Sequence, residues 1–174
     1  MKKTLISLAF STFLVISLIN CSSKKVADPT PAVSTGSASA SINGTAWKSA
    51  SAGALTSGTA TAKLLTISMQ LTEKDNSEFI AIGLTSYTGL ASYAYGGTSN
   101  KTLFNLKYKG QNYSALSVSG TAGSGTIKIT EYVESNGILN PGKVVGEFSG
   151  TVKNISSNEI LTITNGKFTA IKVL

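Results

Sequence analysis

The sequence predicts an all-β domain over residues 38–174, built as a single antiparallel β-sandwich of about ten strands. Apolar and polar residues alternate in short runs, and turn signals rich in glycine and asparagine separate these runs. No segment after the N-terminal apolar run has helical periodicity. Glycines inside several runs favour a sandwich, whose strands bend between two sheets. An up-and-down β-barrel is the alternative that the same pattern allows.

The first predicted element is a β-hairpin over residues 38–48. Asn43-Gly44 separates two alternating runs, and this dipeptide is the strongest short-range signal for a hairpin because both turn positions need a positive φ. A two-residue turn pairs Ala40 with Trp47 on one face of the hairpin. We therefore expect Trp47, the only tryptophan of the chain, to lie in the core.

Most of the remaining domain is predicted to form short strands joined by tight turns. The predicted strands cover residues 65–71, 79–85, 90–95, 103–109, 113–118, 126–132, 144–152, 160–164 and 168–173. Each run places its apolar side chains on one face. Asn165-Gly166 separates the last two runs, so we expect a second two-residue hairpin near the end of the chain.

The N-terminal segment has the residue order of a secretory signal peptide, predicted over residues 1–20. Lys2 and Lys3 provide a positive start, and an unbroken run of apolar and small residues follows. This run, Leu5–Ile19, is shorter than the roughly 20 residues that a membrane-spanning helix needs. The composition becomes polar directly after Cys21.

Cys21 is the only cysteine in the sequence, so no intrachain disulfide can form. The segment Leu18-Ile19-Asn20-Cys21 resembles the bacterial lipobox. This resemblance implies that Cys21 is lipidated and becomes the mature N-terminus. Each buried CH₂ group contributes about 0.8 kcal/mol, so the two or three acyl chains that the resemblance implies would hold a domain at a membrane. The alternative is an ordinary secreted protein with a coincidental cysteine.

Residues 21–37 are predicted to be the lipidated cysteine and a linker. This stretch contains Pro29 and Pro31 and few large apolar side chains. Because little of it can be buried, we expect the linker to be disordered. Such a linker would keep the domain near a membrane without requiring the two to touch.

The domain carries eleven lysines and seven acidic residues, a net charge of +4, and the whole sequence contains neither histidine nor arginine. The lack of histidine excludes Ser-His-Asp and Cys-His catalytic arrangements and the usual histidine-bearing zinc sites. Readers of nucleic acids rely on arginine for bidentate contacts. We therefore expect no nucleic-acid partner, no metal and no cofactor.

Two pairs of acidic residues are the candidates for catalysis. A glycosidase needs two carboxylates that face one cleft. Glu131 lies near Glu134 in the sequence, and Asp75 near Glu78, but both pairs fall at strand ends or turns, where charged residues are ordinarily solvated. The acidic segment 73–78 lacks the spacing and the central glycine of an EF-hand calcium loop. We expect the domain not to be an enzyme.

The candidate ligand-binding residues lie in a segment rich in glycine and tyrosine. Aromatic faces and side-chain amides together suit the binding of a glycan or a peptide at strand ends. The candidates are Tyr87, Tyr93, Tyr95 and Asn100, with Gln111 and Asn112 from a following turn. A glycan site would expose the tyrosine rings on one face. The alternative is that these rings pack into the core with their hydroxyl groups at its rim.

Four segments of the domain carry a resemblance to a known group of proteins. They are Ala40-x-Ile42-Asn43-Gly44-x-x-Trp47, Gly125-Thr126-Ile127-x-Ile129-Thr130, Val145-Gly146-Glu147-Phe148-Ser149-Gly150 and Ile163-Thr164-Asn165-Gly166-Lys167-Phe168. They resemble small lipoproteins of Bacteroidota, which share the order of lipobox, linker and all-β domain. Because these motifs consist of turn and core residues, the resemblance implies fold and location and brings no catalytic residues.

These expectations together describe a lipid-anchored lipoprotein of the cell envelope with a non-catalytic β domain that binds or scaffolds a partner. The outer membrane is the expected membrane, and its periplasmic and surface faces both stay open. The expected partners are membrane lipid, through acylated Cys21, and a glycan or an envelope protein. A carbohydrate-binding accessory lipoprotein is one alternative. A carrier of a lipid or another small ligand is the other, if the domain is a barrel.

Overall fold

Eleven β-strands make up the regular structure of the described residues, which are 35–59, 62–71, 78–96, 102–116, 123–137 and 139–172 of a computed structural model. The strands are β1 (Ser37–Ile42), β2 (Thr45–Lys48), β3 (Ser51–Thr59), β4 (Ala62–Gln70), β5 (Phe79–Leu84), β6 (Ser92–Gly96), β7 (Thr102–Tyr108), β8 (Gln111–Ser114), β9 (Ser124–Val133), β10 (Gly142–Asn154) and β11 (Ile160–Lys172). Within these residues we find no helix with the length and apolar character to cross a bilayer. The predicted signal peptide and Cys21 lie outside the described residues.

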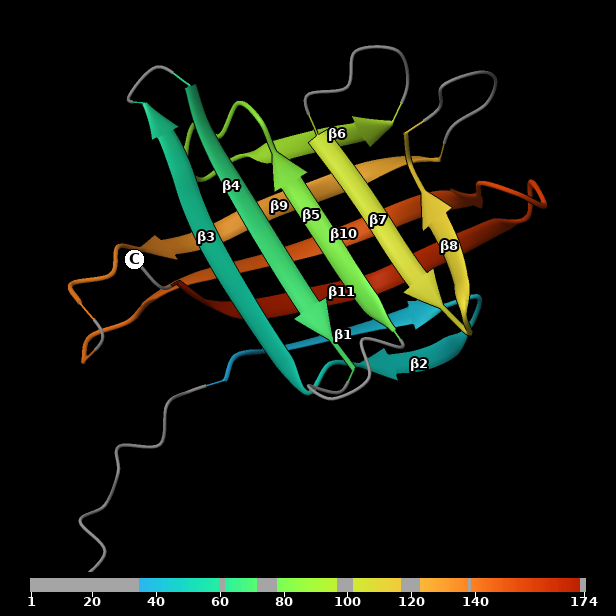
Figure 1. Ribbon diagram of the computed structural model, residues 1–174, viewed down its shortest axis with the longest axis horizontal. Coiled ribbons are helices and arrows are strands. Elements are labelled where there is room, and N and C mark those ends of the chain that lie inside the picture. Colours follow the sequence, from blue (N-terminus) through green and yellow to red (C-terminus); the bar gives the residue numbers. More distant parts are fainter. Residues whose placement is uncertain are drawn as a thin grey trace, which may run out of the picture. The chain divides into compact units, whose positions relative to one another are not determined.

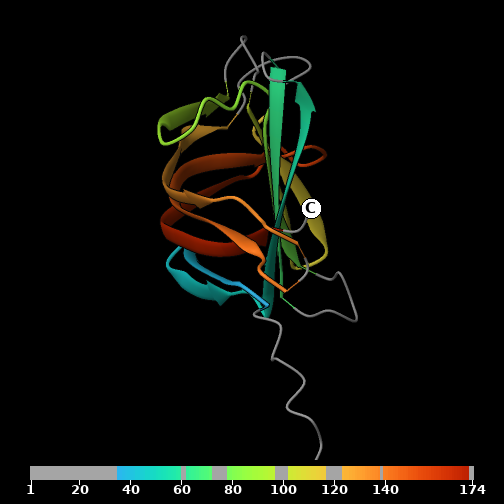
Figure 2. The same ribbon diagram turned by 90° about the vertical axis from the view of Figure 1, so that its left-hand side faces the viewer.

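The strands form two layers, as Figures 1 and 2 show. The front layer has the strand order β3-β4-β5-β7-β8, and the back layer has the order β2-β1-β11-β10-β9-β6. In Figure 1 the strands of the back layer run obliquely behind those of the front layer. The prediction of an all-β fold is confirmed. The strands lie in two layers, as in the predicted sandwich, and they also close on themselves, as in the barrel alternative.

Hydrogen bonds join the two layers at two corners, so that the strands between the corners close into a ring. At one corner β11 pairs with β3 through Ile171–Gly53 and Lys172–Ala54. At the other corner β10 pairs with β8. Corners of this kind are typical of sandwiches whose layers cross at a large angle. The β11–β3 pair is parallel, so the prediction of a purely antiparallel sheet is wrong at this corner.

The first hairpin has the predicted turn and register. Asn43 has a φ of 46° and Gly44 a φ of 81°, as a two-residue turn with two left-handed positions requires. Ala40 pairs with Trp47, and the indole of Trp47 is buried. The hairpin is also fastened to β11, because the side-chain oxygen of Asn43 accepts a hydrogen bond of 2.7 Å from the Thr162 amide.

The second Asn-Gly signal has a different role from the predicted one. β11 continues without a turn through Asn165 and Gly166, so the predicted hairpin at this position is wrong. Asn165 has a φ of 53°, and the register of β11 shifts here against β10. One extra residue in one strand with a left-handed backbone is the signature of a β-bulge. Because β11 is paired on both sides here, the chain cannot turn back at Asn165, and its positive φ produces a bulge within the strand.

β3 is a strand that the sequence reasoning missed. It pairs with β4 along its whole length, from Ser51–Gln70 to Thr59–Ala62. Its inward side chains at the buried end are Ala52 and Ala54, and alanine, serine and glycine have low β-propensity. Apolar and polar residues do alternate along this part of β3, but the apolar side chains are only methyl groups, so the alternation is hard to recognise in the sequence.

The core of the back layer is built from aromatic rings that lie against glycines on the neighbouring strand. Phe168 is paired with Gly146, and Phe148 with Gly166. A Cβ atom at Gly146 would lie 2.6 Å from the Phe168 ring, and one at Gly166 would lie 2.5 Å from the Phe148 ring. Tyr95 covers its partner Gly125 in the same way. These glycines leave the space that the rings occupy.

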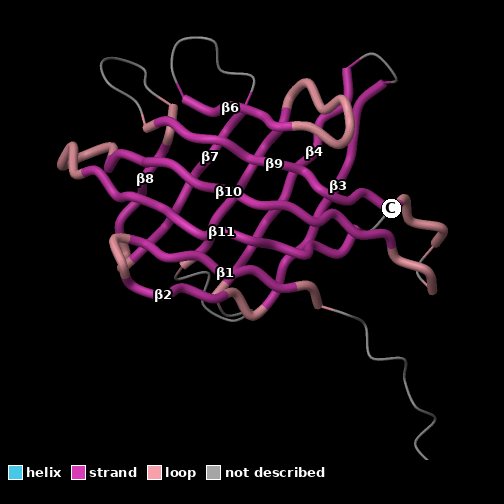
Figure 3. The backbone as a smooth tube through the Cα atoms, turned by 180° about the vertical axis from the view of Figure 1, so that it is seen from behind, coloured by secondary structure: helices cyan, strands magenta, loops and turns pink. Residues whose placement is uncertain are grey.

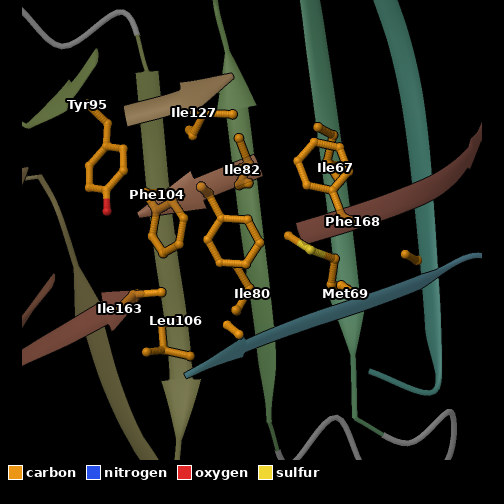
Figure 4. Close-up of a cluster of buried hydrophobic side chains, with 14 of the residues drawn as sticks. Ile67, Met69, Ile80, Ile82, Tyr95, Phe104, Leu106, Ile127, Ile163 and Phe168 are labelled. Carbon is orange, nitrogen blue, oxygen red and sulfur yellow. The ribbon is translucent and has the colours of Figure 1, made fainter. Parts of the chain in front are cut away.

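A row of aromatic rings then connects the two layers. Phe104 of β7 stacks on Tyr95 of β6 with a centroid distance of 4.7 Å. The Phe104 ring also lies 5.7 Å from the ring of Phe148 on β10, which in turn lies 6.3 Å from Phe168 on β11. Offset and tilted pairs at these distances are favourable. Figure 4 shows Phe104 and Tyr95 facing each other, among isoleucines of both layers.

A substitution at Gly146 tests this packing. We expect Gly146→Ala to lower the free energy of unfolding by about 1–3 kcal/mol, because its methyl group would overlap the carbonyl oxygen of Lys128 and the Phe168 ring. Gly53→Ala is the matched control, since the nearest atom to its new methyl group is 4.0 Å away. Denaturant unfolding measures both variants. Equal losses of stability in the two variants would contradict the role of the ring.

Candidate functional site

Tyr95 is a core residue. β6 directs its side chain inward, where 2% of the residue is exposed and the ring stacks on Phe104. Its hydroxyl group donates a hydrogen bond of 3.2 Å to the carbonyl of Ser149. Burial raises the pKa of this hydroxyl well above its usual range. The ring therefore has no free face on which a ligand could stack.

Tyr87 and Tyr93 belong to a second cluster, together with Tyr132. The ring of Tyr87 lies 6.1 Å from that of Tyr93 and 5.4 Å from that of Tyr132. Tyr87 is 7% exposed, and burial and the neighbouring tyrosines raise the pKa of its hydroxyl to about 12. Tyr93 is half-buried, and its hydroxyl group donates a hydrogen bond of 2.7 Å to the Gly89 carbonyl.

The predicted tyrosine site thus separates into two packed clusters. Tyr87 and Tyr95 are both buried, so the arrangement that a glycan site needs, with all three rings exposed on one face, is not present. Asn100 lies outside the described residues, as does Cys21. A ligand-binding role for these residues stays a prediction, and their described contacts are those of core residues.

The sequence did not predict a group of three side chains beside the second tyrosine cluster, which we call the charged clamp: Lys172, Glu134 and Tyr132. Lys172 at the end of β11 is 4% exposed, and its ammonium group lies 2.6 Å from a carboxylate oxygen of Glu134. The hydroxyl of Tyr132 donates a bond of 2.8 Å to the other oxygen. The hydrogen bond from Lys172 is the main cause that lowers the pKa of Glu134, and the same bond raises the pKa of Lys172. A lysine held protonated in this way is a poor nucleophile.

The carboxylates that were considered for catalysis are engaged by other groups. Glu131 forms an ion pair of 2.9 Å with Lys143, and Glu134 belongs to the clamp. Glu78 accepts a hydrogen bond of 3.2 Å from the backbone amide of Lys109, whereas Asp75 lies outside the described residues. Among the residues that the structure describes, no three His, Cys, Asp or Glu side chains gather where they could hold a metal ion.

Two adjoining hollows lie on the outer face of the back layer, the face that Figure 3 turns toward the viewer. One has a volume of about 390 Å³ and lies over β1, β2, β9, β10 and β11. The other has a volume of about 450 Å³ and lies over β6, β9, β10 and β11. Glu147 and Lys167 line both hollows. The hollows therefore form one continuous surface feature.

One row of side chains crosses this face perpendicular to the strands. The strand pairings place Lys128 beside Glu147, Glu147 beside Lys167, and Lys167 beside Ser39. Ser39 in turn is paired with Lys48 at the edge of the layer. At the other edge Ser92 is paired with Lys128. We call these six residues, Ser92, Lys128, Glu147, Lys167, Ser39 and Lys48, the lysine row.

Small hydroxyl side chains flank the lysine row on both sides. Thr126 and Ser149 are paired on one side of it, and Ser37 and Thr169 on the other. The hollows are lined by these residues together with members of the row. A surface of this composition offers hydrogen-bond donors and acceptors and positive charge. The sequence reasoning missed it, because its members come from six strands.

Comparisons with protein-family models, with curated proteins and with solved structures find no match to this chain.

Paired substitutions of tyrosine by phenylalanine test the packing roles of the predicted site residues. The hydroxyl of Tyr87 is buried without a hydrogen-bond partner among the described residues, and such a group costs about 1–3 kcal/mol. We therefore expect Tyr87→Phe to raise the free energy of unfolding by about 1 kcal/mol. Tyr95→Phe loses the bond to Ser149 and should lower it by about 1 kcal/mol.

Thermal or denaturant unfolding of both variants measures these changes. Stability changes of the same sign in the two variants would contradict the account that the Tyr95 hydroxyl has a hydrogen-bond partner and the Tyr87 hydroxyl has none among the described residues.

Proposed function

We propose that this chain is a lipid-anchored lipoprotein of the cell envelope whose β domain is a non-catalytic binding module. In this proposal the acyl chains on Cys21 hold the domain at the membrane, and the stretch between Cys21 and β1 tethers it. The outer face of the back layer is the binding surface. The proposal agrees with the resemblance to small lipoproteins of Bacteroidota.

The location rests on the N-terminal sequence. A positive start, a short apolar run and the segment Leu18-Ile19-Asn20-Cys21 follow one another in the order of a lipoprotein signal. Two or three acyl chains bind a membrane far more strongly than one, because each buried CH₂ group adds about 0.8 kcal/mol.

Two observations together carry the binding role. The outer face of the back layer has a pair of adjoining hollows, and side chains fill the space between the two layers. Aromatic and aliphatic side chains occupy the space between the layers, and twelve large side chains there are less than 2% exposed. Binding surfaces are concave and carry a few well-placed polar groups. On the described surface, the outer face of the back layer has both properties.

The alternatives receive less support from the same observations. A carrier of lipids needs an apolar cavity, whereas Phe104, Phe148 and Tyr95 pack against one another between the layers. A hydrolase needs two free carboxylates or an activated nucleophile, whereas Glu131 and Glu134 each pair with a lysine. A glycan site on Tyr87 and Tyr95 would need rings that are exposed.

Removal of the predicted acylation site tests the location. We expect Cys21→Ser to move the protein from the membrane fraction to the soluble fraction, because no thiol remains to carry acyl chains. Incorporation of radiolabelled palmitate should be lost in the same variant. Ser23→Ala is the control and should keep both the label and the membrane partition. Unchanged membrane partition of Cys21→Ser would contradict the proposal.

A further inference from the structure

We propose that the lysine row binds a linear anionic polysaccharide, one that carries carboxylate or sulfate groups and lies across the strands of the back layer. This inference rests on the proposed binding function and adds the chemical class of the ligand. It is carried by the register of six strands, by the charges on their outer face and by the two hollows beside the row.

The lysines of the row have a regular spacing. Lys128, Lys167 and Lys48 lie on β9, β11 and β2, so one strand separates each lysine from the next. Neighbouring strands lie about 4.8 Å apart, which places successive lysines of the row about 10 Å apart along a line perpendicular to the strands. A polymer with repeating negative charges can contact all three lysines at once, whereas a small anion can contact only one.

The charge of the row is not neutralised within the described part of the chain. Both ion pairs found there involve other lysines, Lys143 and Lys172. The row therefore has three ammonium groups and one carboxylate, that of Glu147, which lies between Lys128 and Lys167 in the pairing. An anionic ligand meets a net charge of +2 along this line, and the attraction steers it to this face.

The remaining groups of the face suit sugar hydroxyls. Ser39 and Ser92 belong to the row, and Thr126, Ser149 and Thr169 flank it. Hydroxyl groups can both donate and accept hydrogen bonds. Glu147 accepts hydrogen bonds only, and between two anionic groups of a polysaccharide it meets sugar hydroxyls that can donate to it. The hollows on either side of the row give room for the sugar rings.

An anionic bilayer fits this face less well. A protein that lies on a bilayer buries apolar side chains below the head groups, but the large exposed apolar residues in the described part of the chain lie elsewhere. They are Leu55, Leu90, Val133, Leu139, Ile155 and Ile160, and none of them lines either hollow. A continuous layer of anionic head groups would also repel Glu147. The geometry therefore favours a polymer with separated charges.

The test measures binding of the full chain, kept in a nonionic detergent, to immobilised polygalacturonate, dextran sulfate and neutral dextran. We expect binding to the two anionic polymers and none to dextran. Replacement of Lys48, Lys128 and Lys167 by glutamine should weaken this binding by about tenfold or more. Raising the salt concentration should also weaken binding of the unchanged chain, because salt screens exposed charges.

The control variant replaces three other lysines, Lys63, Lys107 and Lys153, by glutamine and has the same change in net charge. We expect its affinity to stay within about twofold of that of the unchanged chain. Thermal unfolding shows that both triple variants keep the fold. Equal losses of binding in the two variants, or binding to dextran as tight as to the anionic polymers, would overturn the proposal.

Two further outcomes separate this inference from the proposed function. A full chain that binds none of the anionic polymers, but still partitions into membranes and takes up palmitate, would overturn the polysaccharide and leave the anchor standing. The second outcome comes from hydrogen exchange of β9, β10 and β11, measured with vesicles of phosphatidylglycerol and, for comparison, of phosphatidylcholine. Protection in phosphatidylglycerol vesicles, without protection by polygalacturonate, would overturn the proposal in favour of lipid head groups.

Discussion

The packing of aromatic rings against backbone at glycine positions is the constraint on which the rest of this structure depends. Phe148 and Phe168 lie where a Cβ atom on the partner strand would overlap them, so Gly166 and Gly146 allow the rings to fill the space between the layers. Burial of a phenylalanine side chain contributes about 1.5–3 kcal/mol to the free energy of unfolding. Phe148 also contacts Phe104, which connects the rings of the back layer to the front layer. Strand interiors are ordinarily weakened by glycine. Here the loss is offset by the rings that the glycines admit.

The same register arranges the outer face. Successive side chains of a strand point to opposite faces, so a slip by one residue would exchange the core face with the solvent face. The pairing of Phe148 with Gly166 therefore also brings Glu147 beside Lys167. The bulge at Asn165 lies directly before these pairs and shifts the register of β11. Core packing and the proposed binding surface are in this sense two results of one pairing pattern, and each lysine of the row keeps its place because an aromatic core holds the strands behind it.

The comparison of the two Asn-Gly dipeptides shows how much could be predicted from the sequence. Asn43-Gly44 ends two strands and forms the predicted turn, whereas Asn165-Gly166 forms a bulge, because β11 has partners on both sides along this stretch. Local signals set the backbone conformation, but distant strands decide whether the chain reverses. The all-β class, most strands and the buried Trp47 followed from alternation together with turn signals such as Asn43-Gly44. β3 did not, since its inward residues are alanines. The lysine row could not be predicted at all, because adjacency across six strands depends on register. The tyrosines were identified as a group, but their burial depends on tertiary contacts that no local pattern encodes.

The most direct test of this account is whether the interior is filled, because a filled interior is what directs binding to the outer face. Apolar cavities in proteins bind xenon, so a crystal of the protein under xenon pressure would locate any such space. We expect no ordered xenon between the front and back layers. Ordered xenon beside Phe104 and Phe148 would contradict the account, because a cavity at that position would leave room for a small apolar ligand between the layers.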